Sequence, residues 1–176
     1  MILLPYEQGY LDGLCGVYSV INAVRLIKRN MQEKEAMQLF GRCMRHVEKR
    51  RSLGKVSTGG INQYDLWSIL RKCVLLNYPI NAERPFYNDG KIAVNDYFQQ
   101  LRDYFQKDGK RTAIIFFECR DWDHWTAIRS ITKTQITLFD SALIKTISIP
   151  RCVVNKPTKQ KPYIVTPSMT FYLYKK

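Results

Sequence analysis

A cysteine that follows a turn and opens a helix is the first feature of this sequence that could do chemistry. Asp12-Gly13 predicts the turn, and after Cys15 apolar residues recur at positions 17, 20, 21, 24 and 27, which is the helical period. A thiol at a helix N-terminus lies at the positive end of the peptide dipoles, which favours the nucleophilic thiolate. The flanking Gly13 and Gly16 also predict an accessible sulfur. Cys15 is therefore a candidate nucleophile.

A cysteine nucleophile needs a base to take its proton, and imidazole is the usual one. The chain offers two histidines. His46 lies in the most basic run of the sequence, on a predicted helix, and is most simply a surface residue. His124 follows the acidic turn 121–123 and opens a predicted strand, a position from which a side chain can reach a cleft. A structural histidine is the alternative, but with Cys15 present we expect His124 to be the base.

A catalytic histidine is commonly oriented by a third group that accepts its other ring proton. Asp140 closes the next predicted strand, 135–139, sixteen residues after His124. If the two strands form a hairpin with its turn near residue 132 or 133, residues whose numbers sum to about 265 lie opposite each other. Because 124 and 140 sum to 264, we expect Asp140 beside His124. The alternative for Asp140 is a turn residue at the end of a strand.

Gln8 completes the predicted set, because acyl transfer requires donors for a developing oxyanion. The backbone N–H of Cys15 and the side-chain amide of Gln8 could supply them if the intervening loop folds back. We expect Trp125, Trp122 and Gly13 to line the substrate cleft, with a core position as the alternative for Trp125.

The composition is that of an ordinary globular domain. At 176 residues, with 45% hydrophobic residues, the chain is expected to form one domain with a real core. No apolar run approaches the ~20 residues of a membrane span. The first residues lack the charged and apolar regions of a secretory signal, so we expect a cytoplasmic location or export by another route.

Charge and cysteine usage limit the function classes. A net charge of +13 invites a nucleic-acid or anionic-surface interpretation, but the runs at 42–51 and 156–161 are typical of solvated faces, so nucleic-acid binding is disfavoured. The five cysteines form no CxxC or CxxxH pair, which signals neither a disulfide framework nor a zinc site. Four of them, all but Cys15, are expected to be buried thiols. We expect no cofactor, and the oligomeric state is not indicated.

The periodicity predicts an α+β fold with helices in about residues 1–110 and an antiparallel sheet in about 111–176. Helices are expected at 16–29, at 32–50, from a cap at Asn62, and at 94–105, with 52–60 as a loop and 79–90 as turns. Strands are expected at 112–119, 125–131, 135–139, 144–149 and 170–174. The first of these is a continuous apolar run, which is typical of a central strand buried on both faces.

Taken together, Gln8, Gly13-Leu14-Cys15-Gly16, His124-Trp125 and Asp140 resemble the papain-like cysteine peptidase superfamily, closest to the bacterial C39-like branch. The resemblance implies a papain-like α+β fold with Cys15 as nucleophile, His124 as general base and acid, Asp140 as orienter and Gln8 in the oxyanion hole. The third member is Asp, as in the C39-like branch, rather than the Asn of papain. The Gly-x-Cys-Trp of papain itself is missing.

These residues support a peptidase or amidase that cleaves a peptide or protein substrate through a Cys15 thioester. An acyl- or glutamyl-transferase uses the same triad and stays open, because the sequence does not show whether water is excluded. A non-enzymatic basic module that binds nucleic acid or another anionic partner is the third interpretation. Only this last class predicts a function that survives Cys15→Ala.

Overall fold

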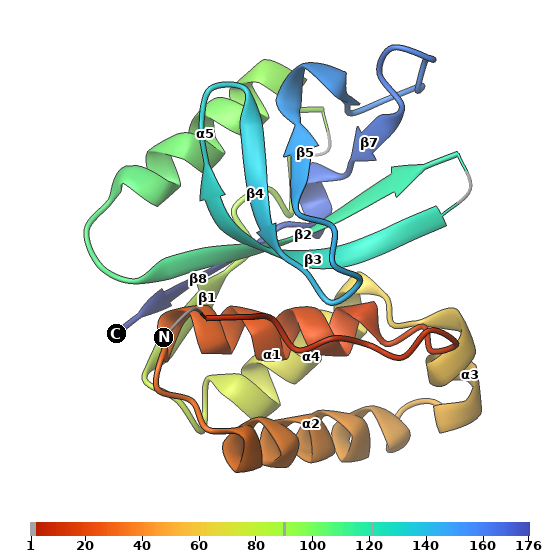
Figure 1. The fold of residues 1–176 in the computed structure, drawn as a ribbon, viewed down its shortest axis with the longest axis vertical. Helices are drawn as coiled ribbons and strands as arrows, with labels where there is room; N and C mark the ends of the chain where they lie inside the picture. Colours follow the sequence, from red (N-terminus) through yellow and green to blue (C-terminus); the bar gives the residue numbers. More distant parts are fainter. Residues whose placement is uncertain (1–2, 90, 121) are drawn as a thin grey trace.

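The computed structural model describes residues 3–89, 91–120 and 122–176. Its helices lie mostly in the first two thirds of the chain (Figure 1). They are α1 (Cys15–Ile27), α2 (Glu33–Glu48), α3 (Leu53–Gly59), α4 (Gln63–Ile69), which continues into the π-helical turn η1 (Leu70–Val74), and α5 (Val94–Gln106). Short 3-10 turns, η2 (Ile149–Arg151) and η3 (Pro167–Met169), occur later between strands.

The strands form one sheet with the order β1-β8-β2-β3-β4-β5. Their bounds are β1 (Ile80–Glu83), β2 (Arg111–Cys119), β3 (Trp122–Ile131), β4 (Gln135–Phe139), β5 (Thr146–Ser148), β6 (Cys152–Val153), β7 (Tyr163–Val165) and β8 (Phe171–Lys175). Pairing is antiparallel along this path, β7 also pairs with the end of β2, and β6 joins β7 in parallel. The protein thus combines helices with a mainly antiparallel sheet, which confirms the predicted α+β class.

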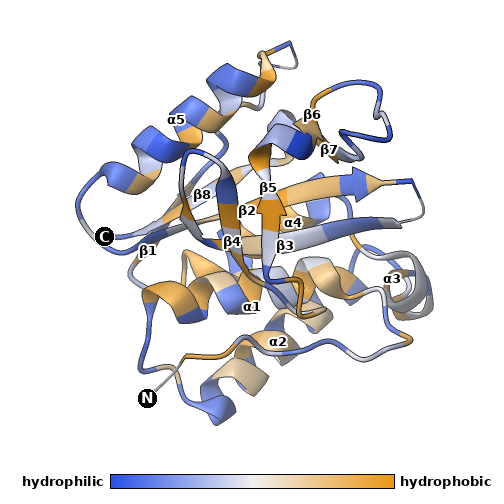
Figure 2. Ribbon diagram, turned by 45° about the horizontal axis from the view of Figure 1, so that its top comes forward, coloured by the Kyte–Doolittle hydropathy of each residue, from blue (hydrophilic) through white to orange (hydrophobic). Residues whose placement is uncertain are grey.

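Helices cover both faces of the sheet, and each face has its own core. α1, α2 and α4 lie on one side and α5 on the other (Figure 1). Alternate residues of β2 enter the two cores: Ile114 packs with the α1 side, whereas Ile115 packs with the α5 side. This alternation confirms the expectation of a central strand buried on both faces. Figure 2 shows that α1 is largely hydrophobic, as expected for a helix held against the sheet.

The predicted α1, α2, α4 and α5 are confirmed, and Asn62 caps α4 by accepting the N–H groups of Tyr64 and Asp65 at 3.0 and 2.9 Å. Three expectations were wrong. Residues 53–59 form helix α3 instead of a loop, and residues 80–83 form β1 instead of turns. Trp122 and Asp123, expected in a turn before the strand, already pair with β2, so His124 is the third residue of β3 and does not open it. Since β1 joins the sheet beside β8, the division into a helical part up to 110 and a sheet part after it is not clean.

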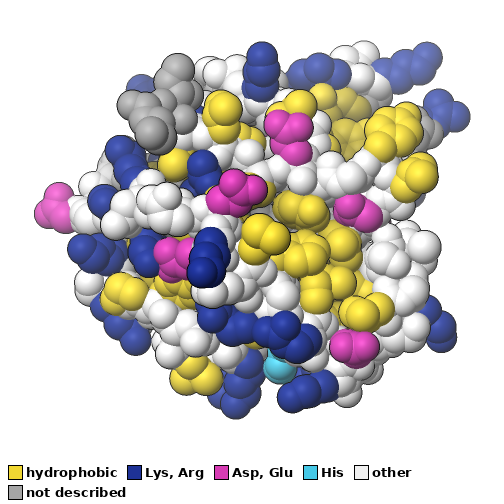
Figure 3. All heavy atoms as spheres, turned by 60° about the horizontal axis from the view of Figure 1, so that its bottom comes forward, with side chains coloured by type: hydrophobic (Ala, Val, Ile, Leu, Met, Phe, Trp, Pro, Cys, Tyr) yellow, Lys and Arg dark blue, Asp and Glu magenta, His cyan; other side chains and the backbone are white. Residues whose placement is uncertain are grey.

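Basic side chains gather on one surface of the helical side. In Figure 3, Lys and Arg surround a histidine next to a patch of hydrophobic side chains. Arg45, Lys49 and Arg50 of the predicted basic run are exposed. Among the residues that the structure describes, no helix combines the length and apolar character needed to cross a bilayer.

Candidate active site

The N-terminus of α1 meets the beginning of β3 at a cavity of about 620 Å³. The N-terminal segment, α1, β3 and the loop between α3 and α4 all contribute to its wall. Five of the predicted site residues line this cavity: Gln8, Gly13, Cys15, His124 and Trp125. Residues far apart in the sequence therefore meet at one site.

His124 and Asp140 form a buried pair. The Nε2 of His124 lies 2.5 Å from Oδ2 of Asp140, and their side chains are 6% and 0% exposed. Burial works to lower the pKa of His124, but hydrogen bonds and charge interactions with Asp140 and Cys15 outweigh it and raise the pKa to about 9. Burial likewise works to raise the pKa of Asp140, yet the hydrogen bond and charge of His124 leave it lowered. His124 is therefore an imidazolium at neutral pH.

Asp140 owes its position to the β3–β4 hairpin and to the turn that follows. Ala127 pairs with Phe139, so the next pair places Asp140 beside Thr126, one diagonal step from His124. The second carboxylate oxygen, Oδ1, accepts the backbone N–H groups of Ala142 at 2.9 Å and of Ile144 at 3.1 Å. These bonds hold the carboxylate in place while its other oxygen orients the imidazole.

Cys15 approaches His124 from the first residue of α1. Cys15 is one of the groups that raise the pKa of His124, and because Nε2 of the ring is bonded to Asp140, Nδ1 is the nitrogen that remains for another partner. Cys15 lines the cavity, but it is only 9% exposed, so the residue is less accessible than the flanking glycines predicted. Gly16 explains this burial: a Cβ there would lie 2.5 Å from Ile61 and 3.2 Å from Trp125, which close over the start of the helix.

The remaining cysteines are not at the site. All five thiols are free, and Cys43, Cys73 and Cys152 are buried as expected. Cys119 is half-buried, which corrects its expected burial. It lies at the end of β2, where the pairing with β3 stops.

Gln8 is held at the site by Ser141 and Asp12. The hydroxyl of Ser141 donates to Oε1 of Gln8 at 3.0 Å, which leaves the Nε2 end of the amide as the donor. That nitrogen makes only a long bond, 3.4 Å, to the carbonyl of Asp12. The Asp12 carboxylate closes the loop by accepting the N–H groups of Gly9 at 2.6 Å and Leu14 at 3.0 Å. The loop does fold back, as the Gln8 prediction required.

The N–H of Cys15 is suited to act beside the Gln8 amide. It belongs to the first residue of α1, so it has no acceptor within the helix. The N–H groups of Val17 and Tyr18 already use the carbonyl of Leu14. An oxygen that develops negative charge in this cavity can therefore be met by a backbone donor that the helix leaves free.

The three residues predicted to line the cleft have different places. Gly13 lines the cavity, and a Cβ on it would lie 3.1 Å from the backbone nitrogen of Gly60, so the loop and the end of α3 approach closely there. Trp125 also lines the cavity, but it is 2% exposed and donates its indole N–H to the carbonyl of Ile61 at 3.0 Å. Trp122 is 42% exposed and packs edge-on against the His124 ring outside the cavity lining.

Sequence reasoning missed two residues of the site. Ser141 carried no signal of its own beyond its position after Asp140. Arg51 lines the cavity and donates to the buried Asp65 at 3.0 Å; in the sequence it was one of several basic residues in a run. His46 lies elsewhere, on α2, with its Nε2 2.8 Å from the hydroxyl of Ser68. Asp121, part of the predicted acidic turn, lies outside the described residues.

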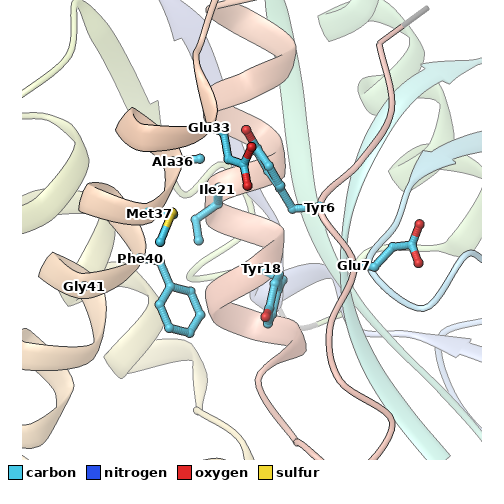
Figure 4. Close-up of a pocket in the computed structure, with 9 residues that line it drawn as sticks. All are labelled: Tyr6, Glu7, Tyr18, Ile21, Glu33, Ala36, Met37, Phe40 and Gly41. Atoms are coloured by element: carbon cyan, nitrogen blue, oxygen red, sulfur yellow. The ribbon is translucent and has the colours of Figure 1, made fainter.

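A second cavity, of about 320 Å³, lies between the N-terminal segment, α1 and α2. Figure 4 shows Tyr6, Tyr18, Met37 and Phe40 converging on it from these elements, whereas Glu7 points away. No Cys or His is among its described lining residues, so it does not compete as a candidate for covalent chemistry.

Comparison with known proteins does not supply a family: no protein-family model matches the chain, and no curated protein matches its sequence.

Proposed function

We propose that this protein is a cysteine peptidase or amidase of papain-like type, with Cys15, His124 and Asp140 as its triad. The observation that carries the proposal is the buried 2.5 Å contact between His124 Nε2 and Asp140 Oδ2, in a ring whose pKa is raised by both Asp140 and Cys15. A cationic imidazole beside a thiol stabilises the thiolate, which is the attacking species.

In the first half of the reaction, the Cys15 sulfur attacks the carbonyl carbon of a peptide or amide. The negative charge that develops on the carbonyl oxygen is met by the N–H of Cys15 and the Nε2 group of Gln8. His124 then gives its Nδ1 proton to the leaving nitrogen as the C–N bond breaks. The products of this half are an amine and a Cys15 thioester.

In the second half, the neutral His124 takes a proton from a water molecule. The resulting hydroxide attacks the thioester, the C–S bond breaks, and the acid product leaves. Asp140 stays ionised throughout and stabilises the imidazolium each time it forms. Gly13 and Trp125 are proposed to contact the substrate from the cavity wall, and Trp122 to shield the outer edge of the His124 ring.

Alkylation by iodoacetamide across pH tests the proposal, because it needs no knowledge of the substrate. Cys15 is expected to react on the order of 10²-fold faster than the half-buried Cys119, and His124→Ala is expected to remove that advantage. Equal rates for the two thiols, or a Cys15 rate that ignores His124, would refute the triad.

Turnover of a peptide library provides the second measurement. Cys15→Ala should abolish cleavage, whereas Cys119→Ala should leave it unchanged. Products should be paired fragments with new carboxyl and amino ends. If cleavage requires an added amine that appears in the product, the protein is a transferase instead.

A further inference from the structure

The end of the molecule away from the candidate active site contains a cavity of about 770 Å³ whose charged lining is basic. α1 spans the distance between the two sites: Cys15 is its first residue, and Arg25 lies in its last turn (Figure 1). The five basic residues of the lining are Arg25, Arg29, Lys110, Arg111 and Arg129, and no Asp or Glu is among its described lining residues. These residues come from three separate segments, so no charge run in the sequence marks the site.

The positive charge of this cavity is not neutralised by the described part of the protein. The ion pairs among the described residues use Lys28, Arg50, Arg51 and His124 as their cations, and none involves a basic residue of the cavity. Like charges held around one concave surface repel each other and raise the local potential. A bound anion would relieve this repulsion.

Three guanidinium groups of the lining lie over aromatic rings: the exposed Arg129 is 5.9 Å from the centroid of the Phe139 ring, and two half-buried arginines are closer to their rings. Arg25 lies 4.3 Å from the centroid of the Tyr6 ring, and Arg111 lies 5.1 Å from that of Tyr104. Stacking uses the flat face of a guanidinium and leaves its N–H edge free for an anion. The Nε atoms of Arg25 and Arg111 are buried, and neither has a hydrogen-bond partner among the described residues. Arg111 uses another of its nitrogens to donate to the carbonyl of Asp108.

The shape and the remaining lining favour a compact ligand. A volume of about 770 Å³ is in the range of small-molecule sites. A single-stranded nucleic acid would require a basic track with several stacking rings, but Phe105 is the single aromatic residue among the described lining residues. Arg29, Lys110 and Arg129 are exposed, so their ends are free to turn toward a bound group.

We propose that this cavity binds a compact polyphosphate, in which several phosphate groups lie close together along one short chain. Such a chain occurs in free tripolyphosphate and in a nucleoside triphosphate. Arginine edges bind phosphate oxygens through paired, charge-assisted hydrogen bonds, which are stronger than neutral ones. The proposal concerns binding alone and is independent of the chemistry at Cys15.

Titration calorimetry with tripolyphosphate and with adenosine triphosphate tests the proposal. The double variant Arg29→Gln/Arg129→Gln removes two exposed charges of the cavity, and Lys156→Gln/Lys159→Gln removes two exposed charges elsewhere. The first is expected to weaken tripolyphosphate binding by about tenfold or more, and the second to leave it within about twofold. Thermal unfolding without ligand checks that both variants are folded.

The outcomes separate the ligand sources. Equal affinity for the two probes identifies the phosphate chain as sufficient, whereas tighter binding of adenosine triphosphate identifies a nucleotide; both support the proposal. Equal losses in the two double variants would overturn it, because net charge alone would then explain binding. So would tighter binding of a single-stranded DNA of about 12 nucleotides than of either probe, or no binding of either probe.

Discussion

Ser141 bonds to Gln8 twice: its hydroxyl donates to the side-chain oxygen at 3.0 Å, and its carbonyl accepts the backbone N–H at 3.1 Å. The two residues are 133 positions apart in the sequence. Because Ser141 directly follows Asp140, one dipeptide holds both the carboxylate beside His124 and the amide proposed for the oxyanion hole. The orientation of the proposed base and that of the proposed oxyanion donor thus depend on the same turn.

Removing either end of the Ser141–Gln8 contact should lower kcat more than it changes KM. Gln8→Ala deletes the proposed donor and is expected to lower kcat by about 10²–10³. Ser141→Ala leaves the donor present but unfixed, and about a tenfold loss is expected. Steady-state kinetics measure both, with the exposed Ser130→Ala as the control. An unchanged kcat in Gln8→Ala would exclude it from the oxyanion hole.

The alkaline limit of activity should depend on Asp140. In the proposed mechanism His124 is protonated when it releases the amine, so kcat/KM is expected to fall above a pH of about 9, where its imidazolium loses the proton. Asp140→Asn removes the charge that helps to raise this pKa. The alkaline fall in kcat/KM should therefore move to lower pH, and activity should drop. Asp108→Asn, an exposed acid, serves as the control. If kcat/KM falls over the same alkaline pH range in the wild type and in Asp140→Asn, the role of the His124–Asp140 pair is contradicted.

Stability should follow the same titration. The pKa of His124 is raised in the folded protein from its ordinary 6.5 to about 9, so the native state holds this proton more tightly than the unfolded chain. This proton contributes to the free energy of unfolding by an amount on the order of 3 kcal/mol. The contribution is complete below pH 6.5 and is lost as the pH rises through about 9. Urea unfolding at a series of pH values measures it. In His124→Gln the decline over this window should be absent.

Asp140 has the opposite dependence. Its pKa is lowered in the folded state, so its contribution is present at neutral pH and is lost as the pH falls below the ordinary range of a carboxyl group. Acid unfolding of Asp140→Asn should therefore begin from a lower stability but show a shallower decline. If stability declines with falling pH equally in the wild type and in Asp140→Asn, other carboxyl groups determine the acid unfolding.

Gly16 should not accept a side chain. In Gly16→Ala the new Cβ would lie 2.5 Å from Ile61 Cγ1, and the loss of stability from overpacking is expected to be about 1–3 kcal/mol. Gly59→Ala is a matched control, because a Cβ added at Gly59 would meet no described atom within 4 Å. Urea unfolding compares the two. Equal stability of both variants would mean that Ile61 moves without cost.

The parts of the fold with a strong local period were predictable. The apolar positions after Cys15 indicated the buried face of α1, and the apolar run of β2 indicated a central strand. β1 was not predictable, because its four residues carry no period and pair with β8, far along the chain. α3 was missed because Val56 is its one buried residue and its sequence is rich in Gly and small polar residues.

The candidate site was predictable because its residue types are scarce. With two histidines in the chain, and one of them in a basic run, His124 was the favoured base. Its approach to Asp140 followed from counting back from the turn. The hydrogen bonds of Ser141 and the cavity position of Arg51 depend on how loops fold in three dimensions, which no short pattern in the sequence encodes.

The irregularity in the β3–β4 hairpin makes its two strands unequal in their tolerance of length changes. Ile128 pairs with Leu138, but Ser130 pairs with Thr137, so Arg129 is an extra residue on β3. A chain that lost Arg129 would form a regular ladder and still bring Asp140 opposite Thr126. A chain that lost one residue of β4 would instead bring Ser141 to that position and exchange a carboxylate for a hydroxyl beside the imidazole. An evolving sequence could therefore shorten the first strand of the hairpin and keep its acid, whereas shortening the second strand would remove it.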